Sequence, residues 1–434
     1  MVTVAAAWAA AAAFAATDAG QGAPEGATGI VYRTLFQDPA AGSDFSLEQH
    51  AIDLINATPD GERITFAFRD FNRDPVADAL IAAQGRGVVV DGVIDGGERT
   101  RAVVQRLKTA LGSDRFVICG EPTFEFNSCI ANSPRFKPSL QHNKFLTFSR
   151  LSDGRQDVVL QTSENFLSPT QFNYYNDMVE IAGDHALHAA YANYVFDMKA
   201  QLRSDDRSQP LAGDGQHNTM FPSPRSQPDW DTNDTIVDRM DEIDCSEGGS
   251  ESGHGLIRVA NMAFRSERAV IMRELIELRN AGCDIDVVAS NADGDIVSGL
   301  VSAGVPLHLF AKRLGTTPAV LVHDKFWLVD AKSTVTGRRT KITYAGSSNW
   351  RGDEQYSDDM LLRIVDDGVY DAYSDYWKLI RSRVVSDPSR STKDTVAPRS
   401  ALTVTPAANA AGWNRSESRS GSPPATATTS PRAG

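Results

Sequence analysis

The fold and the chemistry of this chain are indicated by two similar stretches, His142-Asn143-Lys144-Phe145-Leu146 and His323-Asp324-Lys325-Phe326-Trp327. The first is followed by Thr162-Ser163-Glu164-Asn165 and then by Asn176-Asp177-Met178. The second is followed by Gly346-Ser347-Ser348-Asn349 and then by Asp358-Asp359-Met360. One His-x-Lys pair alone would be an ordinary coincidence on a polar strand. Two copies with the same trailing Asn and Asp-Met predict a single site built from both.

The spacing within each copy favours a β-strand. Residues at i and i+2 of a strand leave the same face, so each His and its Lys are expected to point together. The apolar residues that follow, such as Phe145 and Leu146 or Phe326 and Trp327, indicate a buried strand. One face therefore presents chemistry while the other residues hold it in place.

The residue types suit a phosphate ester. A neutral imidazole can attack phosphorus and an imidazolium can donate a proton to a leaving oxygen, which gives a route through a phosphohistidine. Lysine and asparagine can donate to the non-bridging oxygens, where negative charge builds in the transition state. No metal and no cofactor is expected.

These motifs resemble the phospholipase D superfamily, which carries two His-x-Lys-x4-Asp motifs, each followed by a Gly/Ser-rich turn with an Asn. The second copy fits fully, with Asp330 as the motif aspartate, but the first has Ser149 at that position. The resemblance implies a phosphodiesterase, and by similarity to secreted phospholipases D it implies His142 as nucleophile and His323 as acid. The implied catalytic set is His142, Lys144, Asn165, His323, Lys325 and Asn349.

Four further residues are expected to support this set. Asp177 and Asp359 could orient the two imidazoles by accepting from the other ring nitrogen, or they could simply be solvated or cap a turn. Asp330 is expected to fix local backbone, and Ser347 belongs to the second turn. The histidines at 185 and 188 have a spacing that could hold a metal, but no ligand set completes it, and an exposed helix face is expected.

The order of elements also repeats. Residues 64–68, 75–83 and 88–93 have the pattern strand, amphipathic helix, strand, and residues 256–260, 270–279 and 285–288 repeat it. Each is a βαβ unit. The predicted fold is α/β, with duplicated phospholipase D-like domains, each a mixed sheet flanked by helices, and with the active site at the seam between the halves.

Composition divides the chain further. We expect an N-terminal half at 30–200, a linker or surface excursion at 201–253, a C-terminal half at 254–385 closed by a helix over 370–385, and a disordered tail at 386–434. Residues 1–19 are Ala-rich and apolar and predict a secretory signal peptide, although no Lys or Arg precedes Arg33. A membrane anchor is the weaker alternative, because the run is shorter than the roughly 20 residues of a spanning helix.

The four cysteines agree with export. Cys119 and Cys129 lie in one half and Cys245 and Cys283 are the other near pair, so the disulfides 119–129 and 245–283 are preferred over the two other pairings. Four buried thiols are the alternative. A metal site is not expected, because the sequence contains no Cys-x2-Cys spacing.

The charge balance bears on the substrate. With 56 acidic against 43 basic residues, the formal net charge is −13, which disfavours a nucleic acid, whose binding needs a basic face. The sequence therefore favours a secreted, monomeric phospholipase D acting on a phospholipid at a membrane surface, monomeric because one chain holds both motifs. The alternatives are a nuclease or other non-lipid phosphodiesterase and, more weakly, a non-catalytic binding protein.

A lipid substrate would need apolar side chains at the mouth of the site. Some of the aromatic residues near the motifs are expected to lie there, above all Tyr174 and Tyr175, whose surroundings are too polar for an ordinary buried strand. The full set is Phe126, Phe166, Phe172, Tyr174, Tyr175, Trp327 and Trp350.

Overall fold

The computed structural model describes residues 29–39, 42–132, 139–167, 171–226, 234–310 and 320–385. The predicted signal peptide (1–19) and tail (386–434) lie outside the described residues.

The first half is built on a seven-stranded sheet with the order β1-β8-β6-β5-β2-β3-β4. Its strands are β1 (Val31–Phe36), β2 (Arg63–Phe68), β3 (Val89–Ile94), β4 (Phe116–Ile118), β5 (Lys144–Arg150), β6 (Gln156–Thr162) and β8 (Asp177–Ala182). Strands β2, β3 and β4 are parallel neighbours, and all other neighbours are antiparallel. The sheet is therefore mixed, as predicted.

The second half repeats this sheet. Its strands are β9 (Leu211–Ala212), β10 (Asn218–Pro222), β11 (Ile243–Gly248), β12 (Leu256–Phe264), β13 (Asp284–Ala292), β14 (Leu307–Leu309), β16 (Lys325–Ser333), β17 (Arg339–Gly346) and β18 (Met360–Ile364). The order β10-β18-β17-β16-β12-β13-β14 matches β1-β8-β6-β5-β2-β3-β4 strand by strand. Strands β9 and β11 are additions, on β10 and β16. The duplication predicted from the sequence is confirmed.

Within the described residues, each half carries four α-helices. They are α1 (Ser46–Ala57), α2 (Asp74–Gly85), α3 (Ala102–Leu111) and α4 (His185–Lys199), then α5 (Thr235–Met240), α6 (Ala269–Asn280), α7 (Gly294–Ser302) and α8 (Asp367–Val385). The predicted helices at 75–83, 270–279 and 370–385 correspond to α2, α6 and α8. Helix α2 shows why: Pro75 sits in its first turn, and Val76, Leu80 and Ala83 are buried at helical spacing.

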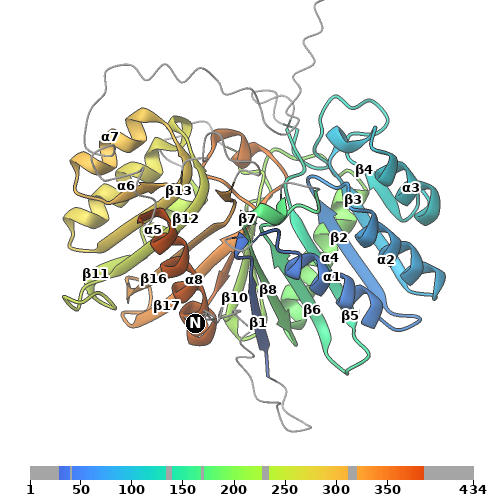
Figure 1. Cartoon of the computed structure of the whole chain (residues 1–434), viewed down its shortest axis with the longest axis horizontal. Helices are drawn as coiled ribbons and strands as arrows, with labels where there is room; N and C mark the ends of the chain where they lie inside the picture. Colours follow the sequence, from blue (N-terminus) through green and yellow to red (C-terminus); the bar gives the residue numbers. More distant parts are fainter. Residues whose placement is uncertain are drawn as a thin grey trace, which may run out of the picture. The chain divides into compact units, whose positions relative to one another are not determined.

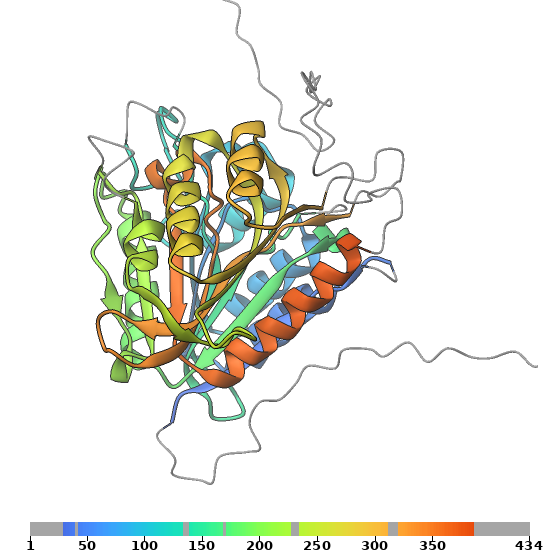
Figure 2. The ribbon, with the colours of Figure 1, turned by 90° about the vertical axis from the view of Figure 1, so that its left-hand side faces the viewer.

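The helices divide the hydrophobic residues into three cores. One lies under α1, α2 and α3, and a second lies under α5, α6 and α7, at the two sides of Figure 1. The third combines residues of both sheets with α4 and α8, for example Phe145, Tyr191, Phe326 and Tyr373. Helix α8 contacts β1 of the first half as well as its own sheet, and it runs beside β1 in Figure 2. The halves thus share a core.

The expectation of a linker at 201–253 is wrong. Strand β10 pairs with β18 as β1 pairs with β8, and α5 and β11 also fall in this segment. The pattern was missed because β10 is short and ends in Pro222, and its neighbours are Ser, Asp, Gly and Pro residues that normally mark loops. The first half therefore ends before β9, and the second begins with it.

Both expected disulfides are present. Cys119 is bonded to Cys129 at 2.08 Å and Cys245 to Cys283 at 2.05 Å. Each joins residues of the same half, as the sequence suggested. Among the helices of the described residues, none is long and apolar enough to cross a membrane.

Candidate active site

The two His-x-Lys motifs meet where the halves join. His142 lies two residues before β5, which begins at Lys144, and His323 lies two residues before β16, which begins at Lys325. The strands are thus slightly shorter than predicted. The backbone N–H of His142 donates to Asp358 of the second half at 2.7 Å, and that of His323 donates to Tyr175 of the first half at 2.9 Å. Each histidine is therefore held by the opposite half.

His142 lies between two carboxylates. Its Nδ1 is 2.8 Å from Glu354 Oε2 and 3.1 Å from Asp359 Oδ2. Burial lowers the pKa of His142, but Glu354 and Asp359 outweigh both burial and the nearby Lys144, and the net pKa is raised. His142 also holds the pKa of Glu354 well below its ordinary value despite burial of that carboxyl. This pairing favours the imidazolium form of His142.

His323 has a different environment. Its Nδ1 lies 2.8 Å from the amide oxygen of Asn176 and 3.2 Å from Lys325 Nζ, and its ring stacks with that of Tyr174 at 5.8 Å. Burial and the neighbouring cations Lys325, Lys144 and His142 lower the pKa of His323 well below its ordinary value. This environment favours the neutral imidazole.

The two lysines are buried beside their histidines. Lys144 Nζ is 3.3 Å from His142 Nε2 and donates to the His142 carbonyl at 2.7 Å, and Lys325 Nζ donates to the His323 carbonyl. Burial lowers the pKa of Lys144 to about 8, and burial together with Lys144 lowers that of Lys325 to about 7. Cations this crowded would be stabilised by an anion between them.

The asparagines and Ser347 lie in the expected turns. Asn165 follows β6 and Asn349 follows β17, and both are buried. The amide of Asn349 donates to Glu354 Oε1 at 2.8 Å, and the hydroxyl of Ser347 donates to Asp359 Oδ1. Asn349 and Ser347 therefore also connect to the two carboxylates that hold His142.

The two aspartates of the Asp-Met segments make different contacts. Asp359 contacts the ring of His142, as expected, and burial raises its pKa to about 6. Asp177 instead accepts from the hydroxyl of Tyr373 at 2.8 Å, while the amide oxygen of Asn176 contacts Nδ1 of His323. The expected orienting role therefore has geometric support for Asp359 and not for Asp177.

The position of the motif aspartate has a structural role in both copies, although Ser149 occupies it in the first. Asp330 accepts from Arg339 Nε at 2.6 Å and Nη2 at 2.8 Å. Ser149, at the matching position, accepts from the backbone N–H of Arg63 at 2.8 Å and donates to Glu62 at 2.6 Å. Both residues hold neighbouring segments of the chain in place, which agrees with the expectation for Asp330.

Glu354 was missed by the sequence reasoning. It lies in the short helix η6 (Gly352–Tyr356) between Asn349 and Asp359. The prediction relied on residues that recur in both copies, and no glutamate stands between Asn165 and Asp177. The only available signal was an acidic residue between the predicted Asn turn and the Asp-Met segment.

Most of the aromatic residues expected at a lipid-facing mouth belong to the core. Phe166, Phe172, Trp327 and Trp350 are at most 1% exposed, and Tyr175 is 2% exposed. Tyr174 is also buried but contacts the ring of His323. Phe126 is half-buried against Arg203. An aromatic rim is therefore not supported by these residues, and Tyr174 belongs to the site itself.

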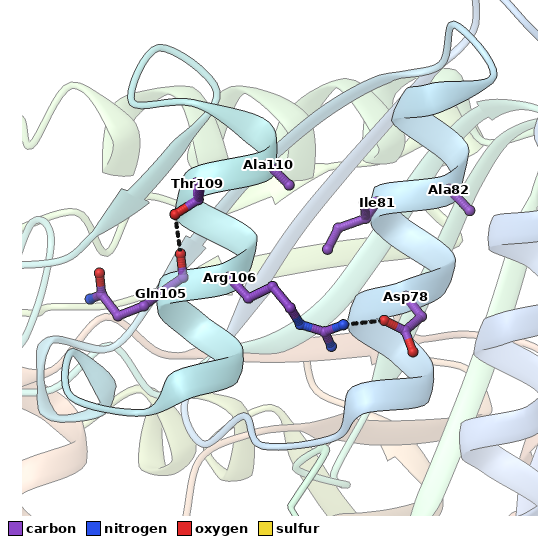
Figure 3. A pocket seen from close by; sticks show the side chains of 7 residues that line it. All are labelled: Asp78, Ile81, Ala82, Gln105, Arg106, Thr109 and Ala110. Carbon is purple, nitrogen blue, oxygen red and sulfur yellow. Dashed lines mark hydrogen bonds and ion pairs between the residues drawn. The ribbon is translucent and has the colours of Figure 1, made fainter.

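One pocket among the described residues lies away from this chemistry. It is an open groove between α2 and α3, lined by Ile81, Ala82 and Ala110 with Asp78 and Arg106, which form an ion pair (Figure 3). A much smaller pocket lies beside Glu354 and Ser348. We assign the site by the convergence of the two motifs, because a shallow helix groove offers no comparable chemistry.

Two groups of side chains in the described part of the chain have the spacing of metal ligands. One is His142, Glu354 and Asp359, and the other is Cys119, Cys129 and Asp358. The cysteines of the second group are disulfide-bonded, and the first group borders Lys144, whose charge opposes a cation. His185 and His188 both approach Asp157, at 3.3 and 3.4 Å; His185 is exposed, as expected for that helix face, but the side chain of His188 is only 14% exposed.

Comparison with protein-family models gives no match, and no curated protein sequence is significantly similar. Solved structures do match. A phosphatidylserine synthase from Haemophilus influenzae superposes with a TM-score of 0.53 at 12% identity, over 81% of this chain and 86% of that chain. A polyphosphate kinase from Porphyromonas gingivalis gives 0.51 at 13% identity, over 81% of this chain and 47% of that chain, so this chain spans about half its length.

Nuc, a phospholipase D family member from Salmonella typhimurium, aligns with 40% of this chain and 96% of its own, with a TM-score of 0.28 at 16% identity. The synthase and kinase matches each extend over 81% of this chain, which is more than either half. By its duplicated sheet order and its matches to the synthase and the kinase, the chain has the two-domain fold that its resemblance to the phospholipase D superfamily implies.

Proposed function

We propose that this protein is a phosphodiesterase that cleaves a glycerophospholipid headgroup through a phosphohistidine. The observation that carries the proposal is the pairing of two unlike histidines at one seam, His142 between two carboxylates and His323 among cations. An acid and a nucleophile are both needed to exchange ester oxygens at phosphorus.

The charge asymmetry favours a role assignment opposite to the one that the family resemblance implies. Neutral His323 attacks phosphorus, a nitrogen–phosphorus bond forms, and the bond to the headgroup oxygen breaks. Protonated His142 gives its proton to that oxygen, and the headgroup alcohol leaves. His142 then takes a proton from water, whose oxygen attacks phosphorus, and the bond to His323 breaks to release phosphatidic acid.

Lys144, Lys325 and the amides of Asn165 and Asn349 stabilise the non-bridging oxygens in this scheme. A phosphodiester brings one negative charge between ammonium groups that crowd each other, so its binding raises the pKa of both lysines and keeps them charged.

A zwitterionic headgroup fits the surroundings of the site. Asp70 lies near enough to Lys144 to influence its pKa, and Asp353 stands in the same relation to His142. Their side chains are 20% and 32% exposed. We infer that the phosphate lies on the cations and that an ammonium headgroup lies toward these carboxylates.

The same acids disfavour a nucleic acid. Arg69 and Arg73, which follow β2 in the first half, are paired with Asp95 at 3.0 Å and with Glu48 at 2.5 Å. A polyanion would meet these neutralised arginines and the partly exposed Asp70 and Asp353, which pair with Arg69 at 3.3 Å and Arg351 at 3.0 Å, on a chain of net charge −13. Export through residues 1–19 and action as a monomer remain proposals, with the two disulfides supporting export.

The substrate is tested with vesicles. The protein should release choline or ethanolamine from phosphatidylcholine or phosphatidylethanolamine vesicles and cleave single-stranded DNA poorly at moderate salt. Replacing Asp70 and Asp353 together by Asn should raise KM for phosphatidylcholine several-fold and leave KM for phosphatidylglycerol, whose headgroup is uncharged, nearly unchanged. Rapid DNA cleavage with intact vesicles would move the assignment to a nuclease.

Turnover should also survive chelation. Because Lys144, Lys325, Asn165 and Asn349 can supply the charge stabilisation that two-metal phosphodiesterases take from their ions, EDTA should leave the rate within about twofold. Initial rates before and after dialysis against EDTA measure this. A complete loss that only added metal restores would contradict the mechanism.

A further inference from the structure

Asp358 reaches from the second half into the first. It is fully buried, and its carboxylate accepts from three successive backbone N–H groups of the first half. The distances are 2.5 Å from Cys129, 3.0 Å from Ile130 and 2.6 Å from Ala131. Hydrogen bonds to a carboxylate are among the stronger ones in proteins, so this is a firm attachment between the halves.

The backbone of Asp358 is attached to the first motif. Its N–H donates to Leu140 O at 2.8 Å, and its carbonyl accepts from the His142 N–H at 2.7 Å and from the Asn143 amide at 3.0 Å. The next residue, Asp359, contacts the His142 ring. One residue therefore joins the 129–131 segment to both the backbone and the carboxylate partner of His142.

The 129–131 segment is itself anchored by a disulfide. Cys129 is bonded to Cys119, which directly follows β4 and donates to Ile94 O of β3 at 2.8 Å. Arg203 adds hydrogen bonds to Ser128 O at 2.8 Å and Ala131 O at 3.1 Å. The three N–H donors thus have a fixed place at the edge of the first sheet.

The arrangement is not repeated in the other copy. Asn176 stands at the matching position, and its side chain contacts His323 and donates to Gln37 at 2.7 Å. At this position Asn176 therefore contacts the histidine itself, whereas Asp358 contacts the disulfide loop.

We propose that Asp358 is a positioning residue for His142, and that the Cys119–Cys129 loop acts on the catalytic centre through it. This inference rests on the proposed function, because it concerns the same histidine. Loss of the loop's hold would let residues 357–359 move, and Asp359 would then align less well with the imidazole. A small displacement of a catalytic group is enough to slow a reaction greatly.

The test uses the full chain and three variants. Asp358→Asn keeps the side-chain size, and Cys119→Ala with Cys129→Ala removes the loop's disulfide but keeps its N–H donors. Cys245→Ala with Cys283→Ala is the matched control, because it removes the other buried disulfide. For each we measure turnover, the melting temperature, and the titration of His142 by NMR with labelled histidine.

We expect Asp358→Asn and the Cys119/Cys129 variant to lose roughly 10- to 100-fold in kcat and to lower the pKa of His142. The control should lose melting temperature while kcat stays within twofold. Equal losses of kcat in both disulfide variants, or an unchanged His142 titration in Asp358→Asn, would overturn the proposal.

Asp358→Asn decides the matter alone if the first disulfide variant does not fold. The titration also separates this inference from the proposed function. If the wild-type protein turns over no phosphodiester, the proposed function fails, and the His142 titration still shows whether Asp358 positions the ring.

Discussion

Replacing either His142 or His323 by Ala is expected to reduce phospholipid turnover by at least about 10⁴-fold. The two imidazoles act on one phosphate, one forming the bond to phosphorus and the other protonating the leaving oxygen. Residues that act as a unit fail together, so the double variant should be hardly slower than either single variant. Initial rates of choline release measure this.

The melting temperature of the His323 variant should stay near that of the wild-type protein, because His323 belongs to none of the three hydrophobic cores, whereas His142→Ala leaves Glu354 and Asp359 buried without their cation and should lower it. His185→Ala, at an exposed helix position, is the matched control and should keep full activity. A rate close to wild type in either the His142 or the His323 variant would refute the proposed site.

The second large effect is expected on the pH dependence. His142 must be protonated to act as the acid, and its raised pKa means that activity is present at low pH and is lost as pH rises through that pKa. Replacing Glu354 by Gln and Asp359 by Asn removes the two groups that raise the pKa. The loss of activity should therefore move to lower pH, with kcat at pH 8 falling by about 10²-fold, the scale of general acid catalysis.

Asp330→Asn is the control for this experiment. It removes a buried carboxylate that pairs with Arg339 outside the site, so it should change stability and leave the pH profile where it is. A pH profile that does not move in the Glu354/Asp359 variant would show that these carboxylates do not set the protonation of His142.

The sequence predicted those parts of the fold that depend on short, repeated patterns. The βαβ units were visible because apolar runs, helical spacing and Gly punctuation recur, and α2 and α6 follow β2 and β12 as predicted. The motif residues were found for the same reason, since both copies place a His-x-Lys at the start of a central strand. Duplication supplied an internal comparison that a single copy would lack.

The parts that were not predicted depend on tertiary contacts. Strand β10 has little apolar pattern of its own and is defined by its pairing with β18. Glu354 breaks the repeat, and its role arises only because η6 brings it to His142. The exchange of Asn176 for Asp177 at His323 reflects side-chain directions in the folded seam, which spacing alone does not fix.

The most direct test of the central claim is to trap the covalent intermediate. In His142→Ala the substrate bis(4-nitrophenyl) phosphate needs no acid for its first step, because nitrophenolate is a good leaving group. Hydrolysis of the phosphohistidine by water is slow without His142 as base. The account predicts a burst of one nitrophenolate per protein and a phosphorylated peptide that contains His323. No burst and no phosphorylated histidine, or a label on His142 in the wild-type protein, would contradict it.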